Sequence, residues 1–390
     1  MNIIEVPISR AAALEAEWSD LCAQADTPNP FFSPAFLTAA LGTLATARST
    51  TVVTIRNPEG RLDGLFPLER RSLYRGFPLR HAQIWRHPYC YLTDPLVRQG
   101  QGRAVAAAVR HWLDGWGPTT GFLVMEMTAQ AGEFGAALTR PGVGPAVIVQ
   151  PERRFQRALL DSPLDAAAYQ LQHWSRRKRK DQRRQRRQLE GLGEVEFVHL
   201  QALADLRAAL PDFLALEAQG WKGAMGTALA SGTASQAFIT ALFAGLRAGE
   251  AEMLVLRMDD RPIAMKLNLC QPGGSFAFKI AYDPEYARFS PGVLLEVFNL
   301  ETVLNDPSRG WMDSCADPDH PMIDALWTER RTMATLKLGR SSAPVRAAMV
   351  AATALDGFDG AIRRQWATLD PDTRTRLQRW RSRARGAALT

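Results

Sequence analysis

The segment from Phe276 to Leu300 holds the residues whose types and spacing most clearly suggest binding chemistry. An apolar, strand-like run stops at Asp283-Pro284, and a short loop then passes through Arg288 to Ser290-Pro291-Gly292. Serine is a favoured helix N-cap, proline suits the first helical position, and glycine lets a ligand approach the backbone. Such a helix start, with a cation beside it, suits a pyrophosphate group. An ordinary strand–turn–helix connection has the same pattern, so both interpretations stay open.

A second distinctive stretch is the basic run SRRKRKDQRRQRR at residues 175–187, which holds nine basic side chains and one acid. Such a run is usually a solvated helix face, but like charges at this density also gain from an anionic partner. We therefore predict an anionic surface or polyanion contact at Arg176–Arg187, with phosphate groups, acidic polysaccharide, anionic lipid headgroups or RNA as the alternatives. No aromatic residue interleaves the run after Trp174, which leaves base stacking unsupported.

The elements that must position these groups follow from apolar periodicity. Helical spacing predicts helices at about 9–25, 101–117, 203–219 and 235–248, and a long helix that carries the basic run and ends at Gly191–Gly193. Ser33-Pro34 is a helix start. Strands are predicted at 82–98, GFLVMEM, VEFVHL, SFAFKIAYD and GWMDSCA. Two hairpins, TVVTIRNPEGRLDGLFPLE and MLVLRMDDRPIAMKLNL, are similar enough to suggest a duplicated α/β unit, although any two hairpins resemble each other.

Length and composition bound the class of protein. A chain of 390 residues suggests two domains, and 46% hydrophobic with 22% charged residues argues against disorder. No apolar run is long enough to cross a bilayer, and the first residues do not resemble a signal peptide. The four cysteines are far apart and form no C-x-x-C pair, which argues against a metal site or a disulfide framework and predicts a cytoplasmic protein.

Several motifs together resemble a known family. The order strand, YDPEY, ARFSPGVLL, helix is similar to the coenzyme-binding strand–loop–helix of the GNAT superfamily. It resembles more closely the CelD-like bacterial acetyltransferases, relatives of the Fem-type aminoacyl transferases. The stretches SRRKRKDQRRQRRQLEGLG, FLALEAQGWKGAMGTAL, DSCADPDHPMIDALWTERR, LFPLERR and YLTDPLV agree with that group in order, so the resemblance spans roughly residues 1–340.

The resemblance implies a mixed α/β (α+β) sheet in two tandem GNAT-like domains, followed by a helical tail. We expect a non-catalytic domain at 1–150, a catalytic domain at 151–345 and a basic helical tail at 346–390. In the catalytic domain, strands at about 275–283 and 310–316 would splay apart, with acetyl-CoA or another acyl-CoA in the gap as cosubstrate and no metal. The residues that would hold the coenzyme are Arg288, Phe289, Ser290, Pro291 and Gly292.

Acyl transfer to an amine needs a base, donors for the oxyanion, and an acid for the leaving thiolate. By resemblance, His320 and Asp313 are candidates for removing the proton, and Tyr282 is the candidate acid. Asp313 could equally be a salt-bridge or turn residue, and His320 a plain loop residue. Cys315 is more often a buried hydrophobe than a nucleophile. Related proteins often carry Asp-Phe-Gly and Tyr-Lys where this chain has Asp-Ser-Cys and Pro-Met.

The acceptor site would be bordered by Glu217, Trp221, Lys222 and Lys279, with core packing as the alternative for Trp221. The resemblance implies an acyl-CoA-dependent N-acyltransferase that acts on the amine of a small molecule or glycan precursor in envelope or exopolysaccharide synthesis. It would lie in the cytoplasm, free or peripherally at the inner membrane. The alternatives are a catalytically degenerate GNAT-fold scaffold and a nucleic-acid-binding protein that uses residues 175–187.

Overall fold

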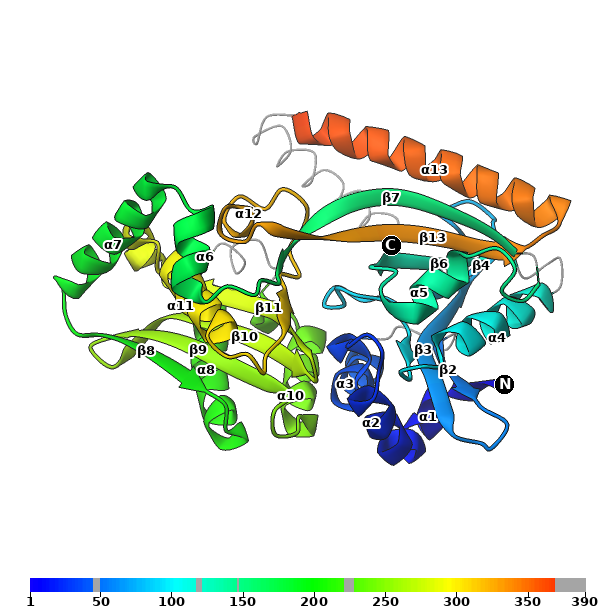
Figure 1. Cartoon of the computed structure of the whole chain (residues 1–390), viewed down its shortest axis with the longest axis horizontal. Helices are drawn as coiled ribbons and strands as arrows, with labels where there is room; N and C mark the ends of the chain where they lie inside the picture. Colours follow the sequence, from blue (N-terminus) through cyan, green and yellow to red (C-terminus); the bar gives the residue numbers. More distant parts are fainter. Residues whose placement is uncertain (45–49, 117–120, 146, 221–227, 369–390) are drawn as a thin grey trace, which may run out of the picture.

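The computed structural model describes residues 1–44, 50–116, 121–145, 147–220 and 228–368. These residues form a continuous mixed sheet of order β1-β2-β3-β4-β6-β13-β7-β12-β11-β10-β9-β8, with β5 paired to β3. Figure 1 shows two halves side by side, joined by two long strands that arch from one half to the other. The mixed α/β fold class predicted from the sequence is therefore confirmed.

The two halves repeat one order of elements. The strands of the first half are β1 (Asn2–Pro7), β2 (Thr50–Arg56), β3 (Leu62–Arg71), β4 (His81–Ile84), β5 (Leu96–Val97) and β6 (Leu123–Thr128). Its helices are α1 (Ile8–Ala11), α2 (Glu15–Ala23), α3 (Pro34–Thr43), α4 (Gly102–Asp114) and α5 (Gly132–Thr139). Ser33 caps α3 through its hydroxyl, which accepts from Phe36 N at 3.3 Å, so this predicted helix start is confirmed.

The second half follows the same plan. Its strands are β8 (Val195–Leu200), β9 (Ala251–Met258), β10 (Arg261–Gln271), β11 (Gly274–Tyr282) and β12 (Trp311–Asp313). Its helices are α6 (Ala166–His173), α7 (Arg176–Glu190), α8 (Leu203–Gln219), α10 (Thr233–Gly245), α11 (Pro291–Leu304) and α12 (Ile323–Leu326). Strand β4 pairs with β6 in parallel, just as β11 pairs with β12, and the two predicted hairpins occupy equivalent places. The repeated order confirms two tandem halves.

The two arching strands, β7 (Val147–Leu160) and β13 (Glu329–Arg340), belong to both halves. They pair with each other from Glu329↔Leu159 to Arg340↔Val147. Strand β13 also pairs with β6 of the first half, and β7 pairs with β12 of the second half. The expected boundary at residue 150 falls inside β7, so the sheet passes through that point without a linker.

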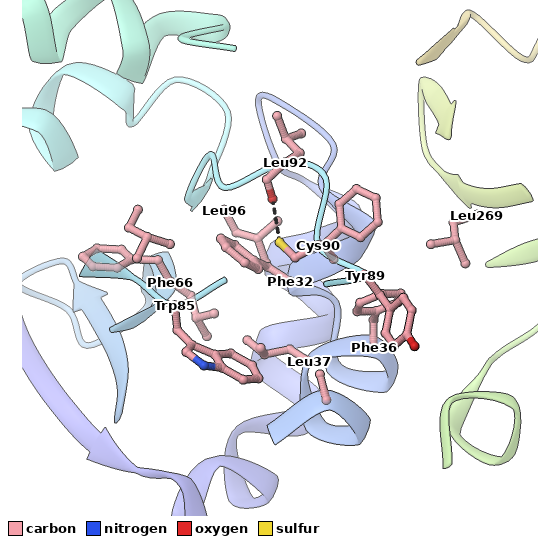
Figure 2. Packing of buried hydrophobic residues seen from close by; sticks show 14 of the residues in the cluster. Phe32, Phe36, Leu37, Phe66, Trp85, Tyr89, Cys90, Leu92, Leu96 and Leu269 are labelled. Carbon is pink, nitrogen blue, oxygen red and sulfur yellow. Dashed lines mark hydrogen bonds between the residues drawn. The ribbon is translucent and has the colours of Figure 1, made fainter. Parts of the chain in front are cut away.

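Aromatic side chains from both halves pack in one core cluster. Phe36 of α3 lies 5.2 Å from the ring of Phe238 and 5.7 Å from that of Phe278, both in the second half. Figure 2 shows the surroundings of Phe36, with Leu269 of the second half lying across from the first-half residues. These edge-to-face contacts add to the free energy gained by burying the rings. The halves are consequently joined by core packing as well as by shared strands.

The final helix, α13 (Ala343–Thr368), lies along the arch of β7 and β13 (Figure 1). Its Asp356 accepts hydrogen bonds from Lys337 Nζ at 2.8 Å and from the hydroxyl of Tyr74 at 2.5 Å. Lys337 is fully buried and also lies 2.6 Å from Glu152 of β7. These charge-assisted bonds hold the middle of α13 on the sheet, and the helix confirms the expected helical tail through residue 368.

Candidate functional site

The predicted gap in the sheet lies between β11 and β12. The two strands pair only at Gly274↔Trp311, Ser275↔Met312 and Phe276↔Asp313. Strand β12 ends there, whereas β11 continues to Tyr282, so the strands separate as expected. The register of β11 against β10 shifts at the same point, because Leu267 pairs with Lys279 and Asn268 pairs with Ala277. Such a bulge locally disrupts the ladder and re-aims the strand.

The loop after β11 forms the 3-10 helix η4 (Pro284–Phe289) and then α11. Asp283 begins η4 by accepting a hydrogen bond from Glu285 N at 3.0 Å. Ser290 differs from the expected side-chain cap, because its backbone is left-handed, with φ 53° and ψ 53°. The Ser290 hydroxyl accepts from Gln185 Nε2 at 3.0 Å, while its main-chain oxygen accepts from the N–H groups of Val293 and Leu294. The basic helix α7 therefore contacts this loop directly.

The other predicted coenzyme residues, Gly292, Arg288 and Phe289, differ in their exposure to solvent. Gly292 lies against β11, where an added Cβ would be 3.4 Å from Tyr282 Cδ1. Arg288 is exposed, and its guanidinium stacks 4.6 Å from the ring centroid of Phe289. Phe289 itself is buried in the apolar cluster that includes Leu294. The loop thus brings Arg288, Ser290 and Gly292 together, while Phe289 anchors it.

A groove of about 560 Å³ opens beside this loop. We call it the loop groove; its lining includes Ser290, Val293, Arg177, Lys178, Gln182, Gln185 and Met322. Lys178 donates to the main-chain oxygen of Ala325, and burial lowers the pKa of its ammonium group. Arg177 is largely exposed and lies 3.8 Å from Asp181. The groove therefore combines cations of α7 with the N-terminal turn of α11, the arrangement that suits a phosphate group.

A smaller cavity of about 170 Å³ contains two more of the predicted residues, Glu217 and Tyr282. Glu217 is only 2% exposed, and its Oε2 accepts from Leu229 N at 2.8 Å. Lys279 Nζ lies 5.0 Å from the ring centroid of Tyr89. Trp221 and Lys222 lie outside the described residues. The end of α8 and the end of β11 thus bring a carboxyl group and a phenol to one cavity.

Asp313 and His320 are not brought together. Asp313 is fully buried, with Oδ2 2.8 Å from Arg331 and Oδ1 3.5 Å from Arg157, and it also accepts from Cys315 N at 2.8 Å. His320 is half-buried before α12, where its Nδ1 accepts from Ile323 N at 3.4 Å. No hydrogen bond joins the two side chains in the part of the chain that the structure describes. Asp313 consequently sits in a two-arginine ion pair.

Cys315 lies next to this ion pair with a positive φ of 53°. It is buried, and burial raises the pKa of its thiol well above the ordinary value. A thiol with a raised pKa is a poor nucleophile at neutral pH, because little thiolate is present.

Sequence reasoning missed Arg157, Arg331 and Gln185. Arg157 and Arg331 stand in charged stretches of β7 and β13, where only strand alternation could have signalled that they point inward. Among the described residues, no group of three or more His, Cys, Asp or Glu side chains could hold a metal ion. Likewise, none of the described helices has the length and apolar character needed to cross a membrane.

Part of the chain matches a known protein family. Residues 176–301 match the family model described as an acetyltransferase (GNAT) domain, a range that runs from α7 into α11. No curated protein matches the chain.

Solved structures show a similar fold. FemX is 9% identical with a TM-score of 0.55, over 86% of this chain and 97% of that chain. A conserved protein of unknown function from Bacteroides thetaiotaomicron is 12% identical with a TM-score of 0.52, over 87% and 100%. L-PGS from Bacillus licheniformis is 11% identical with a TM-score of 0.46, over 87% and 96%. At these identities the first two show a shared fold.

Proposed function

We propose that the chain is an N-acyltransferase that moves an acyl group from acyl-CoA directly to an amine; the match of residues 176–301 to the family model of an acetyltransferase (GNAT) domain supports this proposal. The observation that carries the proposal is the separation of β11 from β12 beside the start of α11. An extended acyl-pantetheine arm fits between strands that diverge, and a pyrophosphate suits the helix start at its mouth. Acetyl-CoA is the donor that we propose.

We place the coenzyme phosphates in the loop groove. The N-terminal turn of α11 contributes its positive dipole end, and Arg177 and Lys178 of α7 contribute positive charge from the opposite wall. Arg288, exposed beside the turn, adds a further cation. The absence of a side chain at Gly292 keeps the ring of Tyr282 clear of the helix start.

We propose that the acceptor amine approaches through the cavity that Glu217 and Tyr282 line. The amine nitrogen attacks the thioester carbonyl, a tetrahedral oxyanion forms, the amine loses a proton, and the thiolate leaves with a proton from an acid. His320 is our candidate base, because histidine is the side chain that most often transfers protons in enzymes, and Glu217 is the next candidate. Asp313 is held by Arg157 and Arg331, so we assign it a positioning role, and Tyr282 is the candidate acid.

The acceptor that we propose is a primary amine on a small molecule or a glycan precursor of the envelope or an exopolysaccharide. This choice is supported by the family resemblance and leaves the individual substrate open. We further propose that the protein works in the cytoplasm or at the inner face of the membrane, where acyl-CoA is available.

Calorimetric titration with CoA and acetyl-CoA tests the donor. Gly292→Val should abolish binding, because the added branches press on Tyr282 and fill the helix start. Gly42→Val is the matched control, since a Cβ at Gly42 meets nothing within 4 Å. Wild-type protein that binds neither CoA nor acetyl-CoA would instead support the scaffold alternative. Transfer of an aminoacyl group from a tRNA without any CoA binding would replace the donor but keep the reaction class.

A further inference from the structure

A second groove, of about 340 Å³, adjoins the loop groove at Gln182 and carries no role in the proposed acyl transfer. We call it the arginine groove; it is lined by residues of α7, α6, β8 and α11. Its floor is apolar and half-buried, formed by Phe197, Val297 and Phe298, whose two rings lie 5.2 Å apart. Half-buried aromatic and aliphatic groups in a concavity are favourable sites for hydrocarbon.

The wall that α7 contributes is cationic. Arg183 is exposed and forms no ion pair among the described residues. Arg186 lies 2.8 Å from Glu190, and its guanidinium sits 5.1 Å from the ring centroid of Phe197. Arg179 also lines the groove, but its Nη1 already donates to main-chain oxygens at the end of α6. Arg183 and Arg186 are therefore the cations placed to meet a ligand over the floor.

Gln182 gives an independent sign that the arginine groove is built for a ligand. This side chain is 9% exposed and lines the arginine groove, where it precedes Arg183 and Arg186 in α7, and it also borders the loop groove. Its Nε2 has no hydrogen-bond partner in the part of the chain that the structure describes. A buried amide donor without an acceptor costs free energy, so a ligand oxygen placed there would remove that cost.

The groove lining holds one acid, Glu301, against the three arginines of α7. Burial raises the pKa of the Glu301 carboxyl, against the lowering effect of Arg186 and Gln170. Its side chain projects from α11 one turn beyond Val297 and Phe298. The groove consequently keeps a net positive wall above an apolar floor, which favours a ligand with both an anionic and an apolar part.

We propose that the arginine groove binds an anionic amphiphile. Its hydrocarbon part would lie on Val297 and Phe298, and its phosphate or carboxylate would lie between Arg183 and Arg186. One oxygen of that group would accept from Gln182 Nε2. This proposal does not depend on the acyltransferase assignment, because the arginine groove lies further along α11, at Val297, Phe298 and Glu301, and shares with the loop groove only Gln182 among the lining residues.

Octyl phosphate, titrated calorimetrically below its micellar concentration, is the first probe. We expect it to bind wild-type protein at least about tenfold more tightly than inorganic phosphate or octyl glucoside, since each of these offers only one of the two parts. Arg183→Gln should weaken octyl phosphate roughly tenfold, the scale of one charge-assisted hydrogen bond. Arg184→Gln is the matched control, because Arg184 is exposed and does not line the groove.

The floor is tested by chain length. Affinity should rise from butyl to octyl phosphate in wild-type protein, and Val297→Asp should remove that rise. If Val297→Asp does not fold, Arg183→Gln and its control carry the test alone. Equal affinity for inorganic and octyl phosphate, or equal losses in Arg183→Gln and Arg184→Gln, would overturn the proposal. So would displacement of octyl phosphate by acetyl-CoA, because the groove would then be part of the coenzyme site.

Vesicles identify the source of the amphiphile. Binding to phosphatidic acid vesicles but not to phosphatidylcholine vesicles, lost in Arg183→Gln, would assign the groove to a bilayer lipid. Binding of octyl phosphate without vesicle binding would assign it to a free amphiphile. Both results support the site and differ only in where its ligand resides.

Discussion

Arg288 is the residue at which the coenzyme proposal can be tested with the least structural disturbance. Its guanidinium is exposed and packs on the ring of Phe289. We expect Arg288→Ala to weaken CoA by about 1–3 kcal/mol, the scale of a charge-assisted hydrogen bond, with an unchanged melting temperature. Calorimetry measures the loss. Arg103→Ala, which removes an exposed cation from α4 of the other half, is the control, and equal effects in the two variants would mean general charge attraction.

His320→Ala tests the base. Among the described residues, the His320 side chain accepts a single long hydrogen bond, from Ile323 N at 3.4 Å, so its removal should leave the fold intact. We expect a lower maximal rate, loss of the acidic limb of the pH–rate profile, and little change in acetyl-CoA affinity. If the variant keeps both its rate and its limb, the base lies elsewhere, and Glu217→Gln is the next variant.

Asp313→Asn tests whether Asp313 stabilises the fold or takes a direct part in catalysis. It leaves the buried guanidinium groups of Arg157 and Arg331 without their carboxylate, at a cost of roughly 3–5 kcal/mol in the free energy of unfolding. Denaturant titration measures this loss. A variant that is as stable as wild type and yet inactive would give Asp313 a direct catalytic role.

His87 predicts the acid sensitivity of the folded chain. Burial among aromatic rings lowers the pKa of His87 from 6.5 to about 3. Below pH 6.5 the His87 side chain therefore binds a proton in the unfolded chain but not in the folded chain. Protonation of His87 thus leaves the free energy of unfolding unchanged above pH 6.5 and lowers it as the pH falls from 6.5 towards 3. The difference at pH 5 is about 2 kcal/mol. We expect His87→Phe to flatten the stability profile between pH 6.5 and 4, and a profile as steep as that of wild type would contradict this.

Individual residues also show which features of the site could be predicted from the sequence and which could not. The helix start at residues 290–292 could be predicted, because serine and proline are favoured at the beginning of a helix. The left-handed backbone of Ser290 could not be predicted, nor could the hydrogen bond that its hydroxyl accepts from Gln185, more than one hundred residues away in the chain. Asp313 was open to a salt-bridge interpretation from the start. Only the pairing of β7 and β13 shows that two arginines hold it.

At the scale of elements, α7 carries the prediction about polyanions. Lys180, Arg184 and Arg187 are exposed and lie at i, i+4 and i+7, which puts them on one face of the helix. If that face attracts a polyanion, changing the three to Glu should abolish binding to anionic glycans, RNA or vesicles, and raised salt should have the same effect on wild-type protein. Pull-down at low salt measures the binding. Wild-type protein that binds none of the three would mean a solvated face.

The elements that were predicted correctly are those whose pattern is local. The two hairpins, β6, β8, β11, α4, α7, α8 and α10 follow apolar periodicity or clear turn residues. Strands β1, β7 and β13 were missed. Strand β7 contains PERRFQR, and β13 contains ERRTMATLKLGR, so their charged residues hide the alternation. The stability of such a long charged strand depends on the strands that pair with it on either side. For β7 and β13 these partners include strands that are distant in sequence, so a local pattern could not reveal them.

The continuity of the sheet across the two halves depends on the pairing of β7 and β13. Strand β7 follows the first half in the chain and pairs with β12 of the second half. Strand β13 follows the second half and pairs with β6 of the first half. Lys337 of β13, Glu152 of β7 and Asp356 of α13 meet in one buried cluster at this seam. A strand exchange of this kind makes the two halves one cooperative unit, in which loss of either long strand leaves an open sheet edge.

Fragments divided at residue 150 test this cooperation. The cut separates Val147–Gln150 from the rest of β7 and leaves β6 without β13 in the first fragment. We expect residues 1–150 and residues 151–390 to be insoluble when produced singly, and to co-purify as a soluble complex when produced together. A tag on one fragment measures the association, and circular dichroism measures the folding. If residues 151–390 alone melt cooperatively as a monomer, the second half folds without its neighbour, and the shared strands contribute stability without being required for the fold.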